Sequence, residues 1–331
     1  MERFQAYRIF EEGGRVAGRL VELGLDDLDP GEVVIRTAYS SINFKDALAA
    51  TGAGRIIRRF PCVGGIDSAG VVVESRDPAF KTGDRVICTS YDLGVAHDGG
   101  FAGCVRVPAA WVVPLPPGLT LKEAMALGTA GYTAALGIHL MEQNDLRPES
   151  GKVVVNGATG GVAGLAIDML AGRGYAVSAI TGKAGEHGYL KMLGAAEVLD
   201  RESLTMGTRP LEKPLWAGAV DSLGGEPLAW LTRTMNQNGV IASIGNAAGV
   251  DLHTTVFPFI LRGVRLLGID SGYTAMPLRR TIWARLAGDL RPRHLVEMTR
   301  TIRLDELPGA FDAFISGGVR GRTVVELAGD I

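Results

Sequence analysis

A short run of β-branched residues is followed by a turn that contains three glycines, and glycines at this spacing can bind phosphate. Residues 153–156 read Val-Val-Val-Asn. Three glycines follow at positions 157, 160 and 161, and an apolar stretch then covers residues 165–170. A strand, a glycine-rich turn and a helix in this order aim backbone N–H groups and a helix N-terminus at a pyrophosphate. Glycine suits such a turn because it accepts positive φ and has no side chain to hold the ligand away. The pattern therefore predicts a dinucleotide-binding site.

A second β-rich run, residues 176–180, indicates which dinucleotide is bound. It ends in Thr181-Gly182-Lys183, and the next acidic residue is Glu186. In a βαβ unit the end of the second strand lies beside the adenosine ribose, where an acid binds the 2′-hydroxyl of NAD and a base accommodates the 2′-phosphate of NADP. Lys183 therefore favours NADPH, and the alternative is a solvated surface lysine.

Length, charge and hydropathy limit the class of protein. The chain has 331 residues, more than one core usually supports, so we expect two domains. A net charge of -2 argues against a nucleic-acid partner, which needs concentrated basic residues. Without a long apolar run or an apolar leader after Met1, the sequence predicts no membrane partner and a soluble, cytoplasmic protein. The odd number of cysteines, three, fits reduced thiols.

Two regions with different patterns position these residues. Up to about residue 120, short strands are separated by Gly/Pro turns, which indicates a small β-barrel-type domain. Strands are expected at residues 33–39 and 69–74, residues 81–88 read as a turn that leads into a third strand, and the pattern continues at 101–107 and 111–115. Helical patterns follow at 121–127 and 131–141, and strands then alternate with helices. The expected strands are 153–156, 176–180, 197–199, 218–221, 240–244 and 264–269, with helices at 162–171, 185–193 and 227–235.

This alternation predicts an α/β fold with a doubly wound parallel sheet. A last strand-like piece, residues 322–327, could return to the first domain. We therefore expect residues 1–122 with 305–331 to form one domain and residues 123–304 to form the dinucleotide-binding domain.

Several blocks of the sequence resemble the medium-chain dehydrogenase/reductase superfamily, and specifically its zinc-free, quinone oxidoreductase-like YhdH/AcuI group. The blocks are Ser40–Leu48, Gly65–Gly70, Gly128–Ala134, Pro210–Lys213, Trp216–Ala219 and Pro258–Arg262. Characterised members of that group are NADPH-dependent acryloyl-CoA reductases. The resemblance implies a GroES-like β-barrel-type catalytic domain followed by a Rossmann domain that binds NADPH.

Zinc alcohol dehydrogenases of the superfamily hold catalytic zinc with a cysteine in a C-x-T-D-like segment and with a G-H-E segment. Here the first segment reads Asn43-Phe44-Lys45-Asp46 and the second reads Gly65-Ile66-Asp67, so the thiolate and the imidazole are both replaced. Cys62, Cys88 and Cys104 lack the C-x₂₋₄-C spacing of structural zinc. No metal is expected.

Without a Lewis acid, the favoured chemistry is hydride transfer to an acceptor that is activated by its own conjugation. The resemblance places residues 43–46 beside the nicotinamide and the substrate carbonyl. Asn43 would donate a hydrogen bond to the developing oxyanion, Lys45 would add positive charge, and Asp46 would orient Lys45. Phe44 replaces a tyrosine common in the group, which leaves its role as a cofactor contact open. The alternative is that Asn43 and Asp46 only cap a helix.

The resemblance also implies further NADPH contacts. The pyrophosphate would be wrapped by Gly157, Thr159, Gly160, Gly161 and Val162. The 2′-phosphate would be met by Thr181, Gly182, Lys183 and Arg201. Other positions near the cofactor are matched by Asn246, Ile260, Ser271 and Gly317. Arg201 could equally be a solvated charge, and Ser271 a turn residue.

Three functions remain open. The leading hypothesis is reduction of the C=C bond of an α,β-unsaturated acyl-CoA, with acryloyl-CoA first. A quinone or enone reductase and a non-catalytic NADPH-binding redox sensor are the alternatives. The apolar edge strand at residues 264–269 is a hazard unless it is paired or covered. Members of the superfamily commonly pair it across a two-fold axis, so the resemblance implies a homodimer. Local helices could cover it instead.

Overall fold

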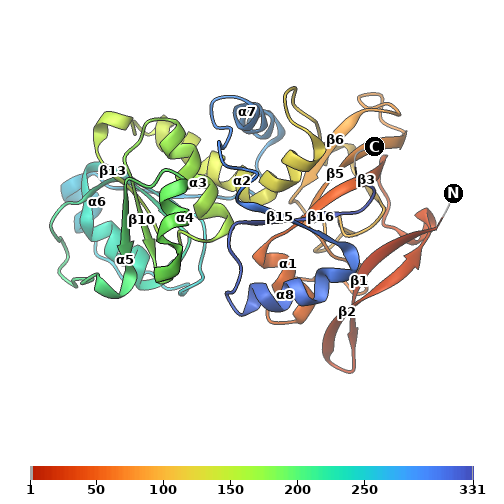
Figure 1. Cartoon of the computed structure of the whole chain (residues 1–331), viewed down its shortest axis with the longest axis horizontal. Coiled ribbons are helices and arrows are strands. Elements are labelled where there is room, and N and C mark those ends of the chain that lie inside the picture. The colour runs from red at the N-terminus through yellow and green to blue at the C-terminus, as the bar shows by residue number, and fades with distance from the viewer. Residues whose placement is uncertain (1–2, 330) are drawn as a thin grey trace. The chain divides into compact units, whose positions relative to one another are not determined.

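The computed structural model describes residues 3–329 and residue 331. The chain forms two compact units. Unit 1 contains residues 1–129, 272–280 and 295–331, and unit 2 contains residues 130–271 and 281–294. Figure 1 labels many of the helices and strands of both.

Unit 1 is built on β-sheet, as its turn-rich sequence predicts. One sheet has the order β15-β16-β3-β5-β6-β8 with β7 paired to β3, and a three-stranded sheet has the order β2-β1-β4. Its strands are β1 (Phe4–Glu12), β2 (Arg15–Leu23), β3 (Val33–Ile42), β4 (Cys62–Val63), β5 (Asp67–Ser75), β6 (Arg85–Thr89), β7 (Cys104–Val107), β8 (Val112–Pro114), β15 (Thr299–Arg303) and β16 (Arg322–Glu326). The hairpin of β1 and β2 was not predicted, although Gly13-Gly14 marks its turn.

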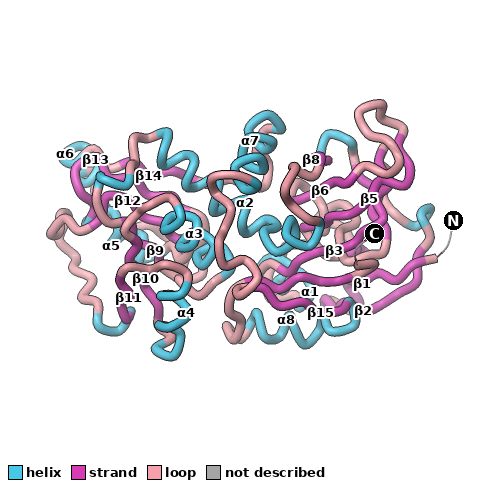
Figure 2. Tube along the Cα trace, turned by 45° about the horizontal axis from the view of Figure 1, so that its top comes forward, coloured by secondary structure: helices cyan, strands magenta, loops and turns pink. Residues whose placement is uncertain are grey.

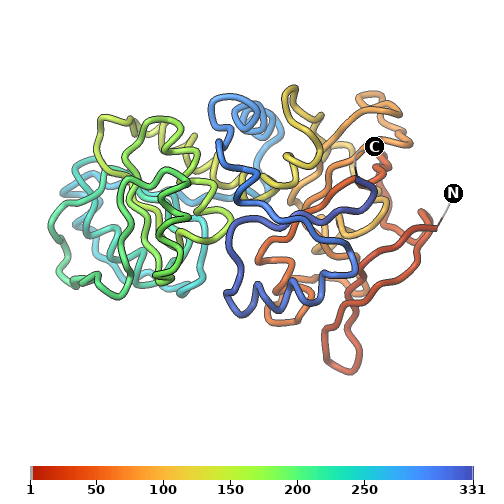
Figure 3. The backbone as a smooth tube through the Cα atoms, viewed as in Figure 1, coloured from red at the N-terminus to blue at the C-terminus, as the bar shows by residue number. Residues whose placement is uncertain are grey.

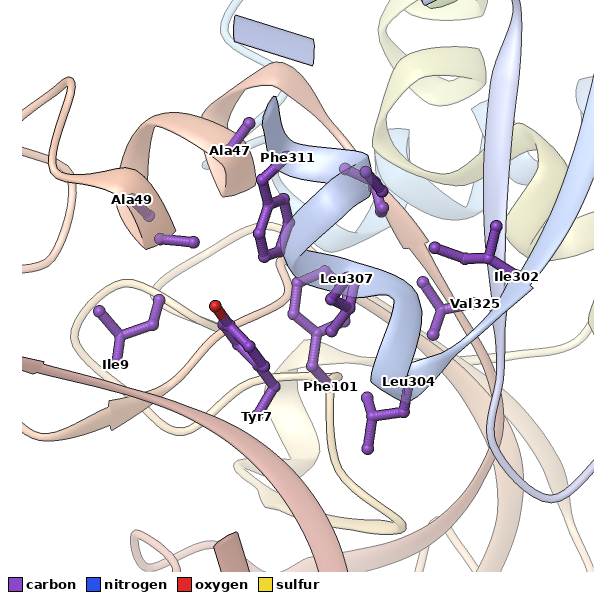
Figure 4. Packing of buried hydrophobic residues seen from close by; sticks show 13 residues of the cluster. Tyr7, Ile9, Ala47, Ala49, Phe101, Ile302, Leu304, Leu307, Phe311 and Val325 are labelled. Atoms are coloured by element: carbon purple, nitrogen blue, oxygen red, sulfur yellow. The ribbon is translucent and has the colours of Figure 1, made fainter. Parts of the chain in front are cut away.

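A hydrophobic cluster joins the first and last parts of unit 1. Helix α1 (Phe44–Thr51) packs with α8 (Leu307–Ile315), and Figure 4 shows Phe311 and Leu307 of α8 among Tyr7, Phe101 and the alanines of α1. Figure 3 traces the same return of the blue C-terminal segment to the red N-terminal strands.

The observed units differ from the predicted domain boundaries at residues 123–129, 272–280 and 295–304, all of which lie in unit 1. The longest of these segments is 295–304. Strand β15 pairs in parallel with β16, with Thr299 opposite Arg322. Ile302 and Leu304 are also buried in the cluster of unit 1. This segment therefore belongs to unit 1, although the alternating pattern had placed it in the dinucleotide-binding domain.

Unit 2 contains the doubly wound sheet that the alternating pattern predicts (Figure 2). Six parallel strands have the order β11-β10-β9-β12-β13-β14. They are β9 (Val153–Val155), β10 (Val177–Thr181), β11 (Glu197–Asp200), β12 (Trp216–Asp221), β13 (Met235–Ser243) and β14 (Arg265–Gly268). The strand order reverses between β9 and β12, and ligands bind at such a switch point in open α/β sheets.

The predicted helices of unit 2 are α3 (Gly161–Gly172), α4 (His187–Met192) and α5 (Gly225–Thr234). Two further helices, α6 (Phe257–Arg262) and α7 (Met276–Ala287), were not predicted. The α7 sequence carries three arginines, and one of them, Arg279, is buried with Ile282, Trp283 and Leu286, so the buried face of this helix does not read as purely apolar.

Helix α2 (Leu121–Gln143) is broken at Gly128, where the backbone has φ 51° and ψ −156°. The break separates the two helical patterns expected from the sequence. By length and composition α2 could cross a membrane, but 83% of its most apolar 18-residue window is buried inside the structure. That burial is typical of a core helix.

Candidate functional site

The glycine turn of unit 2 has the geometry of a phosphate cradle. Gly157 has φ +59°, and a Cβ at Gly160 would meet only the Gly157 oxygen, 3.2 Å away. Helix α3 starts at Gly161, and its first intrahelical bond near the turn joins the Gly164 N–H to Gly160 O. The N–H groups of residues 161–163 therefore lack intrahelical acceptors and face outward with the positive end of the helix dipole. This is the arrangement that a pyrophosphate fits.

Two polar side chains hold the switch point next to this turn. The Asn156 amide donates to Asp221 Oδ1 at 2.5 Å and accepts from the Ser222 N–H at 2.7 Å. Asp221 also accepts from the Gly224 N–H. Burial raises the pKa of Asp221, and these hydrogen bonds oppose the rise. The sequence analysis missed this pair, although a polar residue at the end of each of two neighbouring parallel strands was a usable signal.

The residues expected near a 2′-phosphate come together at the ends of β10 and β11. The Lys183 N–H donates to Thr181 Oγ1 at 3.0 Å. The Arg201 guanidinium lies against Gly182, since a Cβ on this glycine would be 3.0 Å from Arg201 Cζ. A side chain at position 182 would crowd the guanidinium, and Arg201 belongs to this cluster.

The remaining expected cofactor residues are spread over both units. Asn246 is exposed after β13, and the Ser271 hydroxyl accepts from Thr133 Oγ1 at 2.7 Å. Ile260 lies on α6 with 68% of its surface exposed. Gly317 follows α8 in unit 1 and has φ +71°.

In unit 1, residues 43–46 form the start of α1. Asn43 is the N-cap of this helix. The Asp46 carboxylate accepts hydrogen bonds from the backbone N–H of Asn43 at 2.7 Å and from the backbone N–H of Ile66 at 2.9 Å. Phe44 and Lys45 are exposed, whereas Asp46 is 2% exposed. The capping alternative thus describes this segment. The expectation that Asp46 orients Lys45 is wrong, because adjacent helical residues do not face each other.

The side chain of Asn43 is held in a buried polar network. Its Nδ2 donates to Asp67 Oδ2 at 2.7 Å and lies 3.3 Å from Asp46 Oδ2, while its Oδ1 accepts from Arg322 at 3.3 Å. Both amide hydrogens are directed at carboxylates. The geometry therefore does not favour the expected donation from Asn43 to a substrate oxyanion, and it makes Asn43 a part that fixes the loop.

Asp67 and Arg322 are the charged centre of this network, and the sequence analysis assigned neither of them to the site. Asp67, fully buried, accepts from Ser41 Oγ and Thr129 Oγ1, both at 2.6 Å. Arg322, 2% exposed, donates to the carbonyl oxygens of Ala126 and Ile42 and to Ser41 Oγ. The available signal was a charged residue, Arg322, close before the apolar pair Val324-Val325.

The network holds two buried carboxylates against one buried guanidinium. Burial, followed by the nearby charge of Asp67, raises the pKa of Asp46 to about 7. Burial also lowers the pKa of Arg322, and the two carboxylates oppose that change. Asp46 therefore titrates near neutral pH.

Gly128 is required where α2 passes over this network. A Cβ there would lie 2.6 Å from both Asp67 Oδ2 and Ser41 Oγ and 2.8 Å from the Arg322 guanidinium. The break in α2 therefore comes from close approach of its backbone to the charged centre.

Among residues 3–329 and 331, no group of three or more His, Cys, Asp or Glu side chains is arranged to hold a metal ion. Cys62, Cys88 and Cys104 are free thiols, and burial raises the pKa of Cys62 and Cys88 to about 12.

Comparison with known proteins extends over almost the whole chain. The family model "Alcohol dehydrogenase GroES-like domain" matches residues 29–117. The Bacillus subtilis (strain 168) protein named "Putative quinone oxidoreductase YhfP" is 48% identical over 326 residues, 98% of this chain and 99% of the relative. The "Acrylyl-CoA reductase AcuI" of Ruegeria pomeroyi is 42% identical over 318 residues, 96% of each protein.

Solved structures give the same picture. The YhdH oxidoreductase of Salmonella enterica, crystallised in complex with NADP, has a TM-score of 0.95 and 44% identity, covering 98% of this chain and 99% of that one. The Bacillus subtilis YhfP structure, with NAD bound, has a TM-score of 0.96 and 47% identity, covering 99% and 100%.

Proposed function

The chain belongs to the medium-chain dehydrogenase/reductase superfamily, in the quinone oxidoreductase-like group of YhdH, YhfP and AcuI, and from this premise we propose that it is an NADPH-dependent reductase. Its substrate is the C=C bond of an α,β-unsaturated acyl-CoA, with acryloyl-CoA the first to test. The relative named acrylyl-CoA reductase, 42% identical along nearly the full chain, is the main support for the thioester.

The residues present fit NADPH. The outward N–H groups at the start of α3 would hold the pyrophosphate, with Gly157 and residues 159–162 around it. We propose that the 2′-phosphate binds where Arg201 lies against Gly182, beside Thr181 and Lys183. This contact carries the proposal, because two cations at one strand end suit a dianion. When bound, NADPH supplies the hydride that reduces a conjugated acceptor.

The chain's own part in the reaction lies at the start of α1. Asp67 and Arg322 fix Asn43, and Asn43 with Asp46 fixes the first turn of α1. Lys45 is exposed on that turn and would place a positive charge near a developing enolate oxygen. Asn43 and Asp46 act here by holding the loop, and Phe44 presents an aromatic face beside them.

Steady-state oxidation of reduced coenzyme tests this assignment. We expect turnover of acryloyl-CoA and crotonyl-CoA with NADPH to exceed turnover with NADH. Asn43→Ala should lower kcat, whereas the exposed control Lys122→Ala should leave it unchanged. If none of the thioesters supports oxidation of NADPH, the proposed substrate class is wrong. A preference for NADH would contradict the proposed role of Arg201 and Lys183.

A quinone or enone reductase is the second candidate, favoured by the name of the 48% identical relative YhfP. The same assay with a benzoquinone and an enone in place of the thioester separates the two. A protein that binds NADPH but reduces none of these acceptors would be the redox sensor.

We also propose a cytoplasmic homodimer. Strand β14 is the edge of the sheet in unit 2, and α6 beside β13 exposes Phe257, Ile260 and Leu261. An apolar edge of this kind is usually covered. Sedimentation velocity should give a dimer, and a charge at the edge, Leu266→Lys, should shift it toward monomer.

A further inference from the structure

Two neighbouring residues between β6 and Leu93 have a backbone conformation that their side chains disfavour. Among the described residues, the non-glycine residues with positive φ are Ser90, Tyr91, Asp145 and Asn238, at 65°, 51°, 70° and 59°. Asn and Asp tolerate the left-handed region, whereas Ser and Tyr do so much less readily. Ser90 and Tyr91 are also adjacent in the sequence. Such outliers persist only where the surrounding structure fixes them.

The surroundings do fix this turn. The Ser90 N–H donates to Ile66 O at 2.8 Å and the Tyr91 N–H to Gly272 O at 3.1 Å. The Tyr91 ring is stacked on Trp111 at 5.4 Å, and the Arg279 guanidinium lies over the ring at 4.4 Å. Several separate contacts therefore hold a conformation that glycine would adopt without cost.

The hydroxyl is what serine adds over glycine, and its hydrogen bond has a defined direction. Ser90 Oγ lies 3.0 Å from Thr129 Oγ1. Thr129 Oγ1 has one hydrogen, which it donates to Asp67 Oδ1 at 2.6 Å. Ser90 must therefore be the donor to Thr129. A directed chain runs from Ser90 through Thr129 to Asp67.

This chain ends on the carboxylate that orients Asn43. Both oxygens of Asp67 accept from the Thr129 N–H, at 3.1 and 3.0 Å. In addition, Oδ1 accepts from the Thr129 hydroxyl, and Oδ2 accepts from Ser41 and the Asn43 amide. If the Thr129 hydroxyl rotates, Oδ1 keeps only the shared Thr129 N–H, at 3.1 Å, and can compete for the donors of Oδ2. The Ser90 hydroxyl prevents this rotation, because it occupies the acceptor side of Thr129.

We propose that Ser90 is a positioning residue of the site, acting through Thr129 and Asp67 on the loop that begins α1. The proposal rests on the proposed reductase function. It explains why a residue with a hydroxyl occupies a left-handed position at this turn.

Two substitutions separate the hydroxyl from the backbone. Ser90→Gly removes the hydroxyl and relieves the backbone, whereas Ser90→Ala removes the hydroxyl and keeps the strain. We expect kcat with acryloyl-CoA and NADPH to fall about fivefold in both, the effect of one ordinary hydrogen bond. The dissociation constant of NADPH should not change. The urea midpoint should be higher for Ser90→Gly than for Ser90→Ala.

A residue with a merely structural role would give rates that follow stability. Asn238→Gly is the matched control, since it also relieves a left-handed residue, and it should leave kcat at the wild-type value. Wild-type kcat in both Ser90 variants, or a loss in Ser90→Ala alone, would overturn the proposal.

A second measurement does not depend on turnover. In a double-mutant cycle of Ser90→Ala and Thr129→Val, the shifts in urea midpoint should be non-additive, because the two hydroxyls form one chain. Additive shifts would overturn the chain of hydrogen bonds even if the enzyme is active. A wild-type protein that reduces no conjugated acceptor would instead refute the proposed function, and the cycle would still decide on Ser90.

Discussion

Replacement of Gly128 by alanine should destabilise unit 1 strongly. With φ 51° and ψ −156°, this residue lies in a region that is nearly restricted to glycine, which costs a non-glycine residue about 1–3 kcal/mol. The new Cβ would also lie 2.6 Å from Asp67 Oδ2 and Ser41 Oγ. Moving them apart loses at least one buried hydrogen bond to a charged group, worth about 1.5–3 kcal/mol. The expected loss is therefore about 3–5 kcal/mol.

Urea unfolding followed by fluorescence measures this loss. Gly309→Ala is the control in the same unit, because Gly309 lies in α8 and a Cβ there meets no atom within 4 Å. It should gain about 0.5–1 kcal/mol, since alanine is the better helix former. A loss below about 1 kcal/mol for Gly128→Ala would refute the reasoning, because it would mean that the charged centre can move aside freely.

Three further predictions follow from the same contacts. Arg201→Gln should weaken NADPH binding about tenfold or more and leave NADH binding nearly unchanged, because it removes one charge-assisted contact to the 2′-phosphate. Fluorescence titration with both coenzymes measures the two dissociation constants, and an equal loss of affinity for both would contradict this prediction. The folded-state pKa of Asp46, about 7, lies above its ordinary value of 3.8, so its contribution to stability is complete below pH 4 and is lost as the pH rises to about 7. This loss is at most about 4 kcal/mol, and a wild type and an Asp46→Asn variant with the same pH dependence of unfolding would rule it out. Asp168→Ala should lower the free energy of unfolding by about 3 kcal/mol, because the buried carboxylate accepts from the His294 N–H at 2.8 Å and pairs with Arg293. Thermal unfolding should show a much smaller change for the control Asp289→Ala, whose carboxylate is exposed.

Local patterns were sufficient to predict the sheet of unit 2. Its strands are buried on both faces, so runs such as Val153–Val155 read as continuous apolar segments. The glycine turn and the strand end at Thr181 follow from the same local rules. By contrast, the buried face of α7 includes the charged residue Arg279, and β15 has a single buried apolar residue, Ile302, so neither element reads as a regular apolar pattern.

The charged network of unit 1 was beyond local reasoning. Arg322 and Ile42 are 280 positions apart, and nothing near either residue indicates the other. The resemblance to a family directed attention to residues 43–46, whose part in the reaction stays a prediction. It could not show that the Asn43 amide points at Asp67, because that depends on which buried groups need partners.

The insertion of unit 2 within unit 1 has a consequence for the order of biosynthesis. Residues 41–67 leave the ribosome long before Arg322. Until Arg322 is translated, the buried carboxylates of Asp46 and Asp67 have no guanidinium beside them, so the polar network of the first unit is incomplete. The second unit has all of its strands by residue 268 and can mature earlier. Catalytic competence is thus acquired late, after the coenzyme-binding half is already formed.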